Sequence, residues 1–598
     1  MTDLERHDYD VVVIGAGGAG LRAAIEAHEQ GARTAVVCKS LLGKAHTVMA
    51  EGGIAAAMGN VYAEDGWKVH FRDTMRGGKM LNHWRMAQLH AQEAPDRVRE
   101  LEDWGALFDR TPDGLISQRD FGGHRFARLA HVGDRTGLEL IRTLQQQTVA
   151  LGIDVYMECT VTKLLTAADG SISGAFGYFR ESGRFLALQA PSVVLATGGI
   201  GKSYKVTSNS WEYTGDGHSL ALDAGATLVN MEFVQFHPTG MVWPPSVRGI
   251  LVTESVRGDG GVLKNSNGNR FMFDYIPDYF RKETAETEEE ADRWYTDKTN
   301  NRRPPELLPR DEVARAINSE VKAGRGSPHG GVFLDIASRR DADYIKKRLP
   351  SMYHQFKELA EVDITSEAME VGPTCHYVMG GVEVDPETAA AAVPGLYAAG
   401  EVAGGMHGSN RLGGNSLSDL LVFGRRAGTA AAAHATTTSA AALPESALQE
   451  AEAAALAPFE RGGGENPYTI HAELQETMNE LVGIIRTESE VSQALKQIAE
   501  LKVRARALTV HGERRYNPGW HLALDLPNML RVSEAIARAA LERQESRGGH
   551  TRDDFPGPSD EWAKINVICT QDGDGIALSR KPLPVMPPEL AEIFEEQA

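Results

Sequence analysis

Three glycines near the start of the chain have the spacing of a phosphate-binding turn. Gly15, Gly17 and Gly20 follow the apolar run 11–14 in the pattern G-x-G-x-x-G. The first glycine of such a motif permits a tight turn, and the second lets the backbone approach a pyrophosphate. The third lets a helix pack closely on the strand. These residues therefore predict a bound dinucleotide whose pyrophosphate lies at the N-terminus of the following helix.

A histidine further along the chain could touch the same ligand. His46 stands in the stretch 44–53, which reads KAHTVMAEGG. A histidine at this place could be bonded to the cofactor itself. Such a bond would separate an ordinary oxidoreductase from one that oxidises a very stable substrate.

The elements that position these residues can be read from the pattern of apolar residues. The run 11–14 is typical of a strand that is buried on both faces, and 21–27 reads as the next helix. A second strand, 34–38, is followed by Lys39 and Ser40. The acidic residue that usually binds the ribose of NAD is missing there, which argues against NAD and leaves FAD open.

The rest of the chain suggests a divided α/β architecture. A buried strand at 192–199 ends in small residues, a helix is expected at 218–224, and 395–401 resembles a strand that delivers Glu401 to a cofactor hydroxyl. Further helices are expected at 418–425 and 427–442, and helical spacing continues from 484 to about 545 before an extended, proline-containing tail. We interpret 281–306 as a solvated surface insertion. The predicted units are a discontinuous cofactor-binding domain (1–240 and 366–430), a capping domain (241–365), a helical domain (431–545) and a C-terminal region (546–598).

Bulk properties fit a large enzyme with an acidic surface. The chain has 598 residues and a formal net charge of −20, which disfavours nucleic acid as a partner. No apolar run reaches the length of a membrane helix, and no signal peptide is visible. Four dispersed cysteines without a C-x-x-C pair predict a reduced compartment. They predict neither a zinc site nor an iron–sulfur cluster in this chain, and we expect no metal.

Eleven motifs in order carry a family resemblance. They are GAGGAG (15–20), HTVMAEGG (46–53), FGGHR (121–125), ATGG (196–199), TGDG (214–217), QFHPTG (235–240), TESVRGDGG (253–261), RDEVARAI (310–317), HYVMGG (376–381), GSNRLGGNSL (408–417) and RRYNPGWHLALDL (514–526). On these motifs the chain resembles the flavoprotein subunit of the succinate dehydrogenase/fumarate reductase family. The resemblance implies a Rossmann-like FAD-binding domain of the glutathione-reductase type, an inserted α+β capping domain and a C-terminal helical domain.

The resemblance also implies a substrate site whose chemistry can be argued. Oxidation of a saturated dicarboxylate removes a hydride from one carbon and a proton from its neighbour. The protein must therefore hold two carboxylates and move a proton. Guanidinium forks, imidazoles and hydroxyls suit carboxylates. By resemblance, His237 and Thr253 would hold one carboxylate, His376 and Arg411 would hold the other, and Phe121 would pack beside the substrate.

The implied proton-transfer residue is Arg310. An arginine is normally protonated throughout, so it needs a relay that replaces its proton, and Glu254 and Arg257 match the family's relay. In isolation, Arg310 before two acidic residues would read as a surface ion pair. Its place in the RDEVARAI motif favours the catalytic role.

The residues expected to bind the cofactor are spread over the whole first domain. His46 is expected to bond covalently to the flavin 8α carbon, which raises the flavin potential. A helix beginning near Gly414 would face the flavin pyrimidine. The full set is Gly15, Gly17, Gly18, Gly20, Lys39, Ser40, His46, Thr47, Gly52, Gly53, Ala196, Thr197, Gly198, Asp216, Glu401, Asn410, Arg411, Gly414, Asn415, Ser416 and Leu417.

The expected function is that of a succinate:quinone oxidoreductase flavoprotein. It would pass electrons to an iron–sulfur subunit, then to quinone through membrane anchor subunits, at the cytoplasmic face of the membrane. The C-terminal half, including the segment 547–552, is the expected docking region for a partner, with an ordinary basic turn as the alternative for that segment. A physiological fumarate reductase is an open alternative that Glu51 favours by resemblance. A soluble aspartate-oxidase-like enzyme and a silent FAD-binding scaffold are less favoured.

Overall fold

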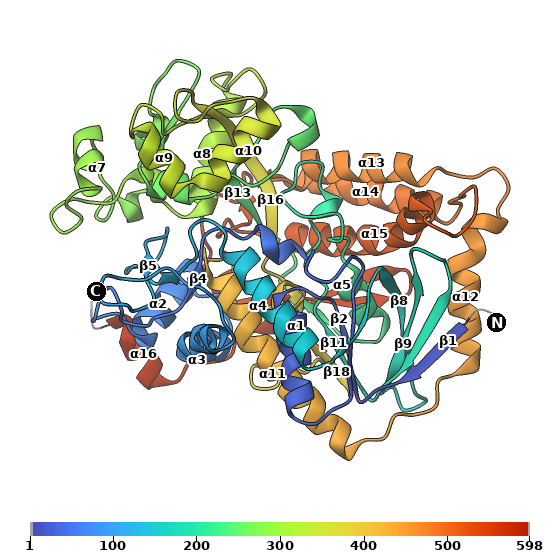
Figure 1. The fold of residues 1–598 in the computed structure, drawn as a ribbon. Helices are drawn as coiled ribbons and strands as arrows, with labels where there is room; N and C mark the ends of the chain where they lie inside the picture. The colour runs from blue at the N-terminus through green and yellow to red at the C-terminus, as the bar shows by residue number, and fades with distance from the viewer. Residues whose placement is uncertain (1–3, 596–598) are drawn as a thin grey trace.

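A parallel sheet at the centre of the molecule carries the glycine motif (Figure 1). The computed structural model describes residues 4–595, so the ends of the predicted domains at 1–3 and 596–598 lie outside the described residues. The strand order is β18 (Leu396–Ala398), β11 (Ser192–Leu195), β2 (Val11–Ile14), β3 (Thr34–Val37) and β7 (Asp154–Tyr156). All four residues of β2 are buried, as the continuous apolar run predicts.

Two long helices pack against each other beside this sheet. Helix α1 (Gly18–Glu29) contacts α11 (Asn415–Thr437) along much of its length. Gly424 and Gly428 of α11 permit the close approach, because a Cβ atom there would lie 2.6 and 2.3 Å from backbone oxygens of α1. The prediction of two helices at 418–425 and 427–442 was therefore wrong, since α11 is continuous and ends at Thr437.

Further sheets and helices complete the first domain. One sheet has the order β1 (Leu4–Asp8), β10 (Phe185–Gln189), β9 (Ile172–Phe179) and β8 (Cys159–Thr166), and a small one has β4 (Ile54–Ala55), β6 (Leu129–Ala130) and β5 (Gln118–Arg119). The remaining helices of this part are α2 (Trp67–Gly77), α3 (Trp84–Asp103), α4 (Thr136–Ala150) and α5 (Asp216–Asp223).

The capping domain has its own sheet and core. The sheet order is β13 (Val234–Met241), β16 (Met369–Val378), β15 (Val332–Asp335) and β14 (Val262–Lys264). A separate hydrophobic cluster extends from Met241 to Val371. The helices, at the top of Figure 1, are α6 (Ser255–Gly258), α7 (Glu288–Trp294), α8 (Arg310–Lys322), α9 (Ala342–Arg348) and α10 (Pro350–Ala360).

The segment 281–306 is only partly the solvated insertion that its composition predicted. Many of its residues are exposed, but Ala291 and Trp294 are buried. Glu306 is fully buried and accepts a 2.6 Å hydrogen bond from Arg270. The hydroxyl of Tyr295 donates to the backbone oxygen of Arg257 at 2.8 Å. The segment therefore packs against the capping domain at Arg257 and Arg270.

The C-terminal part is helical and then returns to the first domain. Its helices are α12 (Glu445–Glu460), α13 (Pro467–Leu481), α14 (Glu488–Ala505) and α15 (Pro518–Glu542), and the helical spacing expected at 484–485 is broken by the short strand β19 (Ile485–Arg486). The tail is not a lone extended segment. It contains β20 (Thr551–Arg552), a hairpin of β21 (Ile565–Asp572) and β22 (Gly575–Pro582), and α16 (Pro588–Glu595). Strand β21 joins β12 (Leu228–Val229), which also pairs with β17 (Gly381–Val382).

The basic turn 547–552 serves contacts within the chain. His550 is fully buried beside Arg486, and Arg552 pairs with Asp554 at 2.7 Å. Arg547 donates to the backbone oxygen of Lys79 at 3.3 Å. The turn thus joins the C-terminal region to the first domain, and its part in docking a partner stays a prediction. Among residues 4–595, no helix combines the length and apolar character needed to span a membrane.

Candidate active site

A deep cavity runs from the N-terminus of α1 to the boundary with the capping domain. The glycine turn forms one end of it: Gly15 has a φ of +117°, and a Cβ atom there would lie 2.1 Å from the backbone oxygen of Ala196. Helix α1 has no side-chain cap and no acidic residue in its first turn. The N–H of Gly18 donates to Oγ1 of Thr47 at 3.3 Å, and the positive dipole end of the helix fits the pyrophosphate of a dinucleotide.

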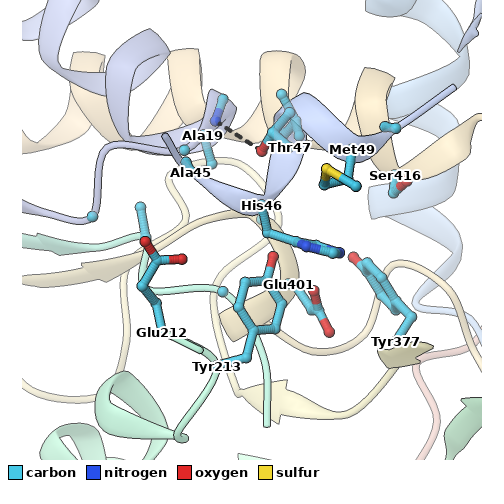
Figure 2. A pocket seen from close by; sticks show the side chains of 18 of the residues that line it. Ala19, Ala45, His46, Thr47, Met49, Glu212, Tyr213, Tyr377, Glu401 and Ser416 are labelled. Atoms are coloured by element: carbon cyan, nitrogen blue, oxygen red, sulfur yellow. Dashed lines mark hydrogen bonds between the residues drawn. The ribbon is translucent and has the colours of Figure 1, made fainter. Parts of the chain in front are cut away.

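His46 projects into the middle of this cavity from a single 3-10 turn, His46–Met49. Figure 2 shows its ring beside Tyr213, with Glu401 and Tyr377 nearby, and the ring centroids of His46 and Tyr213 are 4.8 Å apart. The backbone N–H of Ser210 donates to Nδ1 at 3.3 Å. Burial lowers the pKa of His46 to about 4, so the ring is neutral and keeps a nucleophilic nitrogen.

Lys39 lies at the other end of the cofactor cavity, where it bridges two carboxylates. Its Nζ is 2.8 Å from Oδ2 of Asp216 and 2.7 Å from Oδ1 of Asp525. Asp525 comes from α15 of the helical domain. The structure therefore ties Asp216 to Lys39, and the helical domain reaches the cofactor cavity through this ion pair.

The flavin end of the cavity combines a raised carboxyl pKa with a helix terminus. Burial raises the pKa of Glu401 to about 8, and its Oε1 accepts a hydrogen bond from the N–H of Val378 at 3.1 Å. Helix α11 begins after Gly414, whose φ is +85°, without a side-chain cap. Its N-terminus faces the cavity at Ser416 and Leu417 and can stabilise negative charge there.

Two histidines mark the substrate end, at the junction with the capping domain. His237 on β13 and His376 on β16 have ring centroids 5.2 Å apart. The N–H of Thr239 and the hydroxyl of Ser208 lie 3.2 and 2.8 Å from the Nδ1 atoms of His237 and His376. Burial, reinforced by nearby charges that include arginines, holds both pKa values well below the ordinary histidine range. Both rings are therefore neutral hydrogen-bonding groups.

Arg310 enters the same cavity from the first turn of α8. Its Nε donates to Oε2 of Glu254 at 3.1 Å, and Oε1 of Glu254 accepts from the N–H of Gly122 at 2.8 Å. Burial alone would raise the pKa of Glu254, but Arg310 and Arg257 hold it below its usual value. Arg257 lies behind Glu254 at 3.8 Å, and burial lowers its pKa. Arg310 is thus a buried partner of Glu254 and not a surface ion pair.

Gln235 is a site residue that the sequence interpretation missed. Its Oε1 accepts hydrogen bonds from Nη2 of Arg411 at 3.0 Å and from Nη1 of Arg310 at 3.4 Å. It therefore fixes both guanidinium groups at one point. The signal was available, because Gln235 stands two residues before His237 on one strand and shares its face.

Almost all the predicted site residues come together here. Four of them do not line the cavity: Gly20, Arg257, Asn410 and Asn415. Gly20 lets α1 approach Gly15, and Asn415 binds His70 and Thr74. Asn410 donates to Asp311 of α8 at 2.9 Å. Gly20, Asn410 and Asn415 thus hold neighbouring elements in place outside the cavity. Arg257 acts through Glu254. Within the described residues, His, Cys, Asp and Glu form no group of three or more that could hold a metal ion.

A dinucleotide-binding site that opens onto a cationic, histidine-lined pocket is typical of an FAD-dependent oxidoreductase. Residues 10–417 match the family model described as FAD binding domain, and 471–592 match the one described as Fumarate reductase flavoprotein C-term. The chain belongs to the succinate dehydrogenase/fumarate reductase flavoprotein family, as its motifs predicted.

Individual relatives cover nearly the whole chain. A fumarate reductase (CoM/CoB) subunit of Methanothermobacter marburgensis is 44% identical, covering 94% of this chain and 97% of its own. The succinate dehydrogenase flavoprotein subunit of Coxiella burnetii is 36% identical over 95% of each. The solved structure of Mycobacterium smegmatis Sdh1 in complex with UQ1 is 64% identical, covers 99% of this chain and 97% of that chain, and has a TM-score of 0.87.

Proposed function

We propose that this chain is the flavoprotein subunit of a succinate:quinone oxidoreductase that oxidises succinate to fumarate. The observation that carries the proposal is the convergence of Arg310, Arg411, His237 and His376 on one end of the FAD cavity, where the first three are buried and His376 is half-buried. Two guanidinium groups and two neutral imidazoles in one pocket suit a dianion with two carboxylates. FAD would supply the chemistry of hydride acceptance.

The binding residues divide between the two ends of the substrate. His237 and Thr253 hold one carboxylate, while His376 and Arg411 hold the other, and Phe121 packs against the carbon chain. Arg411 is held over the ring of Tyr377, with its Cζ 4.4 Å from the ring centroid, and by Ser416 at 2.9 Å. Burial, together with the charge of Arg310, lowers its pKa to about 10, so it remains a cation at neutral pH. The geometry of the two carboxylates is thus preset before the substrate arrives.

The proton follows a relay of charged groups. During succinate oxidation a proton leaves the substrate for Arg310 as Arg310 passes one to Glu254. Arg257 is the next group in line, and its lowered pKa makes it easier to deprotonate than an exposed arginine. The hydrogen bond of 3.1 Å between Arg310 and Glu254 supports this order.

The covalent bond and the partners are further parts of the proposal. A neutral His46 in contact with the cavity supports an 8α-histidyl bond to the flavin. The likeness to Sdh1 in complex with UQ1 supports an iron–sulfur subunit, membrane anchor subunits and quinone as the electron path. It also supports attachment to the cytoplasmic face of the membrane through those partners.

Physiological fumarate reduction is the second candidate. Two observations favour it: the 44% identity with a subunit of a fumarate reductase, and Glu51, which lines the cavity beside Gly52. Both directions use the same binding residues, because a catalyst serves a reaction in both directions.

Dye-coupled turnover of the isolated, flavin-loaded chain tests the proposal. We expect succinate-dependent reduction of a dye and no reduction with aspartate. Flavin-loaded protein that turns over neither succinate nor fumarate would refute the proposed reaction. The ratio of succinate oxidation to fumarate reduction by the native complex with its own quinone decides the direction.

A further inference from the structure

The substrate site is closed between two bodies. Arg310 and Glu254 belong to the capping domain, and their side chains are 10% and 3% exposed. Arg411 and Phe121 face them from the first domain and are also buried. The contacts between the two domains therefore bear on how a dicarboxylate is enclosed beside these groups.

One of these contacts is an unusual helix cap. Helix α10 of the capping domain begins at Pro350, and its N-cap residue Leu349 offers no side-chain acceptor. Asp134 of the first domain supplies the acceptor instead. Its two carboxyl oxygens accept hydrogen bonds of 2.9 Å each from the backbone N–H and the hydroxyl of Ser351. An aspartate beside a helix N-terminus satisfies free N–H groups and complements the helix dipole.

The position of Asp134 makes this arrangement notable. It stands one residue before Arg135, the N-cap residue of α4, and α4 has no side-chain cap bond. The side chain points across the domain boundary and is fully buried. A buried polar contact is little screened by water, unlike the exposed Lys298–Asp120 pair at the same boundary.

The two helices at this contact, α10 and α4, both lie against residues of the site. Met352 and Phe356 anchor α10 in the core of the capping domain. Gln355, one turn after Ser351, donates to the backbone oxygen of Leu251 at 2.9 Å, and Leu251 lines the cavity. On the other side, α4 lies against the 3-10 turn that carries His46.

We infer that Asp134 is a positioning residue that holds the capping domain closed over the substrate by capping helix α10 from the other domain. The identity of the substrate rests on the proposed function, but the capping of α10 by Asp134, which we call the latch, does not. A second buried contact, between Asn410 and Asp311, holds another part of the same boundary. Loss of Asp134 therefore shifts the open–closed balance without abolishing closure.

The test compares two helix-capping aspartates in the flavin-loaded protein. Asp134→Ala removes the cap across the boundary. Asp341→Ala removes the cap of α9 inside the capping domain, where Asp341 accepts from the N–H of Tyr344 at 2.8 Å. We expect Asp134→Ala to raise KM for succinate and for fumarate by the same factor, about tenfold, with kcat within about twofold, because fewer free molecules are closed. Asp341→Ala should leave both KM values unchanged.

Amide hydrogen exchange provides a readout that needs no turnover. Exchange in the first turn of α10 should accelerate in Asp134→Ala but not in Asp341→Ala. Ser351→Ala keeps the backbone bond and should raise KM less, and the double variant should match Asp134→Ala alone. Unchanged exchange in α10, or a fall in kcat with no change in KM, would overturn the latch. If even the wild type fails to turn over dicarboxylates, the proposed function fails while the exchange comparison still tests Asp134.

Discussion

Gln235 offers a sharp test of how charge is arranged at the substrate site. Its Oε1 lies 3.0 Å from Arg411 and 3.4 Å from Arg310 but does not line the cavity. Gln235→Glu keeps the shape and adds a negative charge behind the two guanidinium groups. For a substrate carboxylate about 7 Å away, this charge costs about 2 kcal/mol at an effective dielectric constant of 20, or about thirtyfold in KM.

Steady-state kinetics with succinate and with fumarate measure this effect. Gln235→Leu removes the acceptor without adding charge, so we expect it to raise KM less than Gln235→Glu while lowering thermal stability, because two buried donors lose a partner. Gln146→Glu is the matched control, since Gln146 also accepts from an arginine (3.0 Å) but on the surface of α4. Equal KM values for Gln235→Glu and Gln235→Leu would refute the electrostatic reasoning.

Four further predictions concern single groups of the site. Arg310→Lys should lower turnover by at least about a hundredfold while the flavin stays bound, because the relay loses its proton carrier; turnover and flavin absorbance measure this. His46→Ser should release the flavin on acid denaturation, whereas the wild type keeps it, and should lose succinate oxidation before fumarate reduction. Burial and Asp134 hold the pKa of Glu51 well above its usual 4.5, so Glu51 becomes charged only as pH rises. Its negative charge should then raise KM as pH rises, and Glu51→Gln should remove that rise from the pH profile. Lys39→Met leaves two buried carboxylates without their partner and should lower the free energy of unfolding by about 3–5 kcal/mol in denaturant titration.

Each of these has an outcome that contradicts it. Near-normal turnover of Arg310→Lys would remove Arg310 from the mechanism. Flavin that washes out of the denatured wild type would exclude the histidyl bond. An identical rise in KM with pH for Glu51→Gln would assign that rise to another group, and an unchanged unfolding free energy for Lys39→Met would mean that the ion pair is not formed.

Much of the fold and most of the site could be predicted where the signal is local. The glycine turn needs only a strand, three spaced glycines and a helix, and the structure has this order in β2 and α1. The predictions were wrong where packing against distant segments decides the extent of a helix or the burial of a side chain. The break expected between 425 and 427 is absent because no residue there interrupts α11, which packs against α1 on both sides of it. Likewise, the charged composition of 281–306 concealed the buried Glu306.

The glycine turn, the family motifs and the types of side chain available for a dicarboxylate can all be identified without coordinates. How these groups act on one another became visible only in the folded chain. Gln235 joins Arg310 to Arg411, Asp525 reaches Lys39 from the helical domain, and Asp134 caps a helix of another domain. The physical reason is that spacing along a chain specifies neighbours within a turn or a strand. Contacts between residues hundreds of positions apart depend on how whole elements pack, and they set the charges and pKa values of the site.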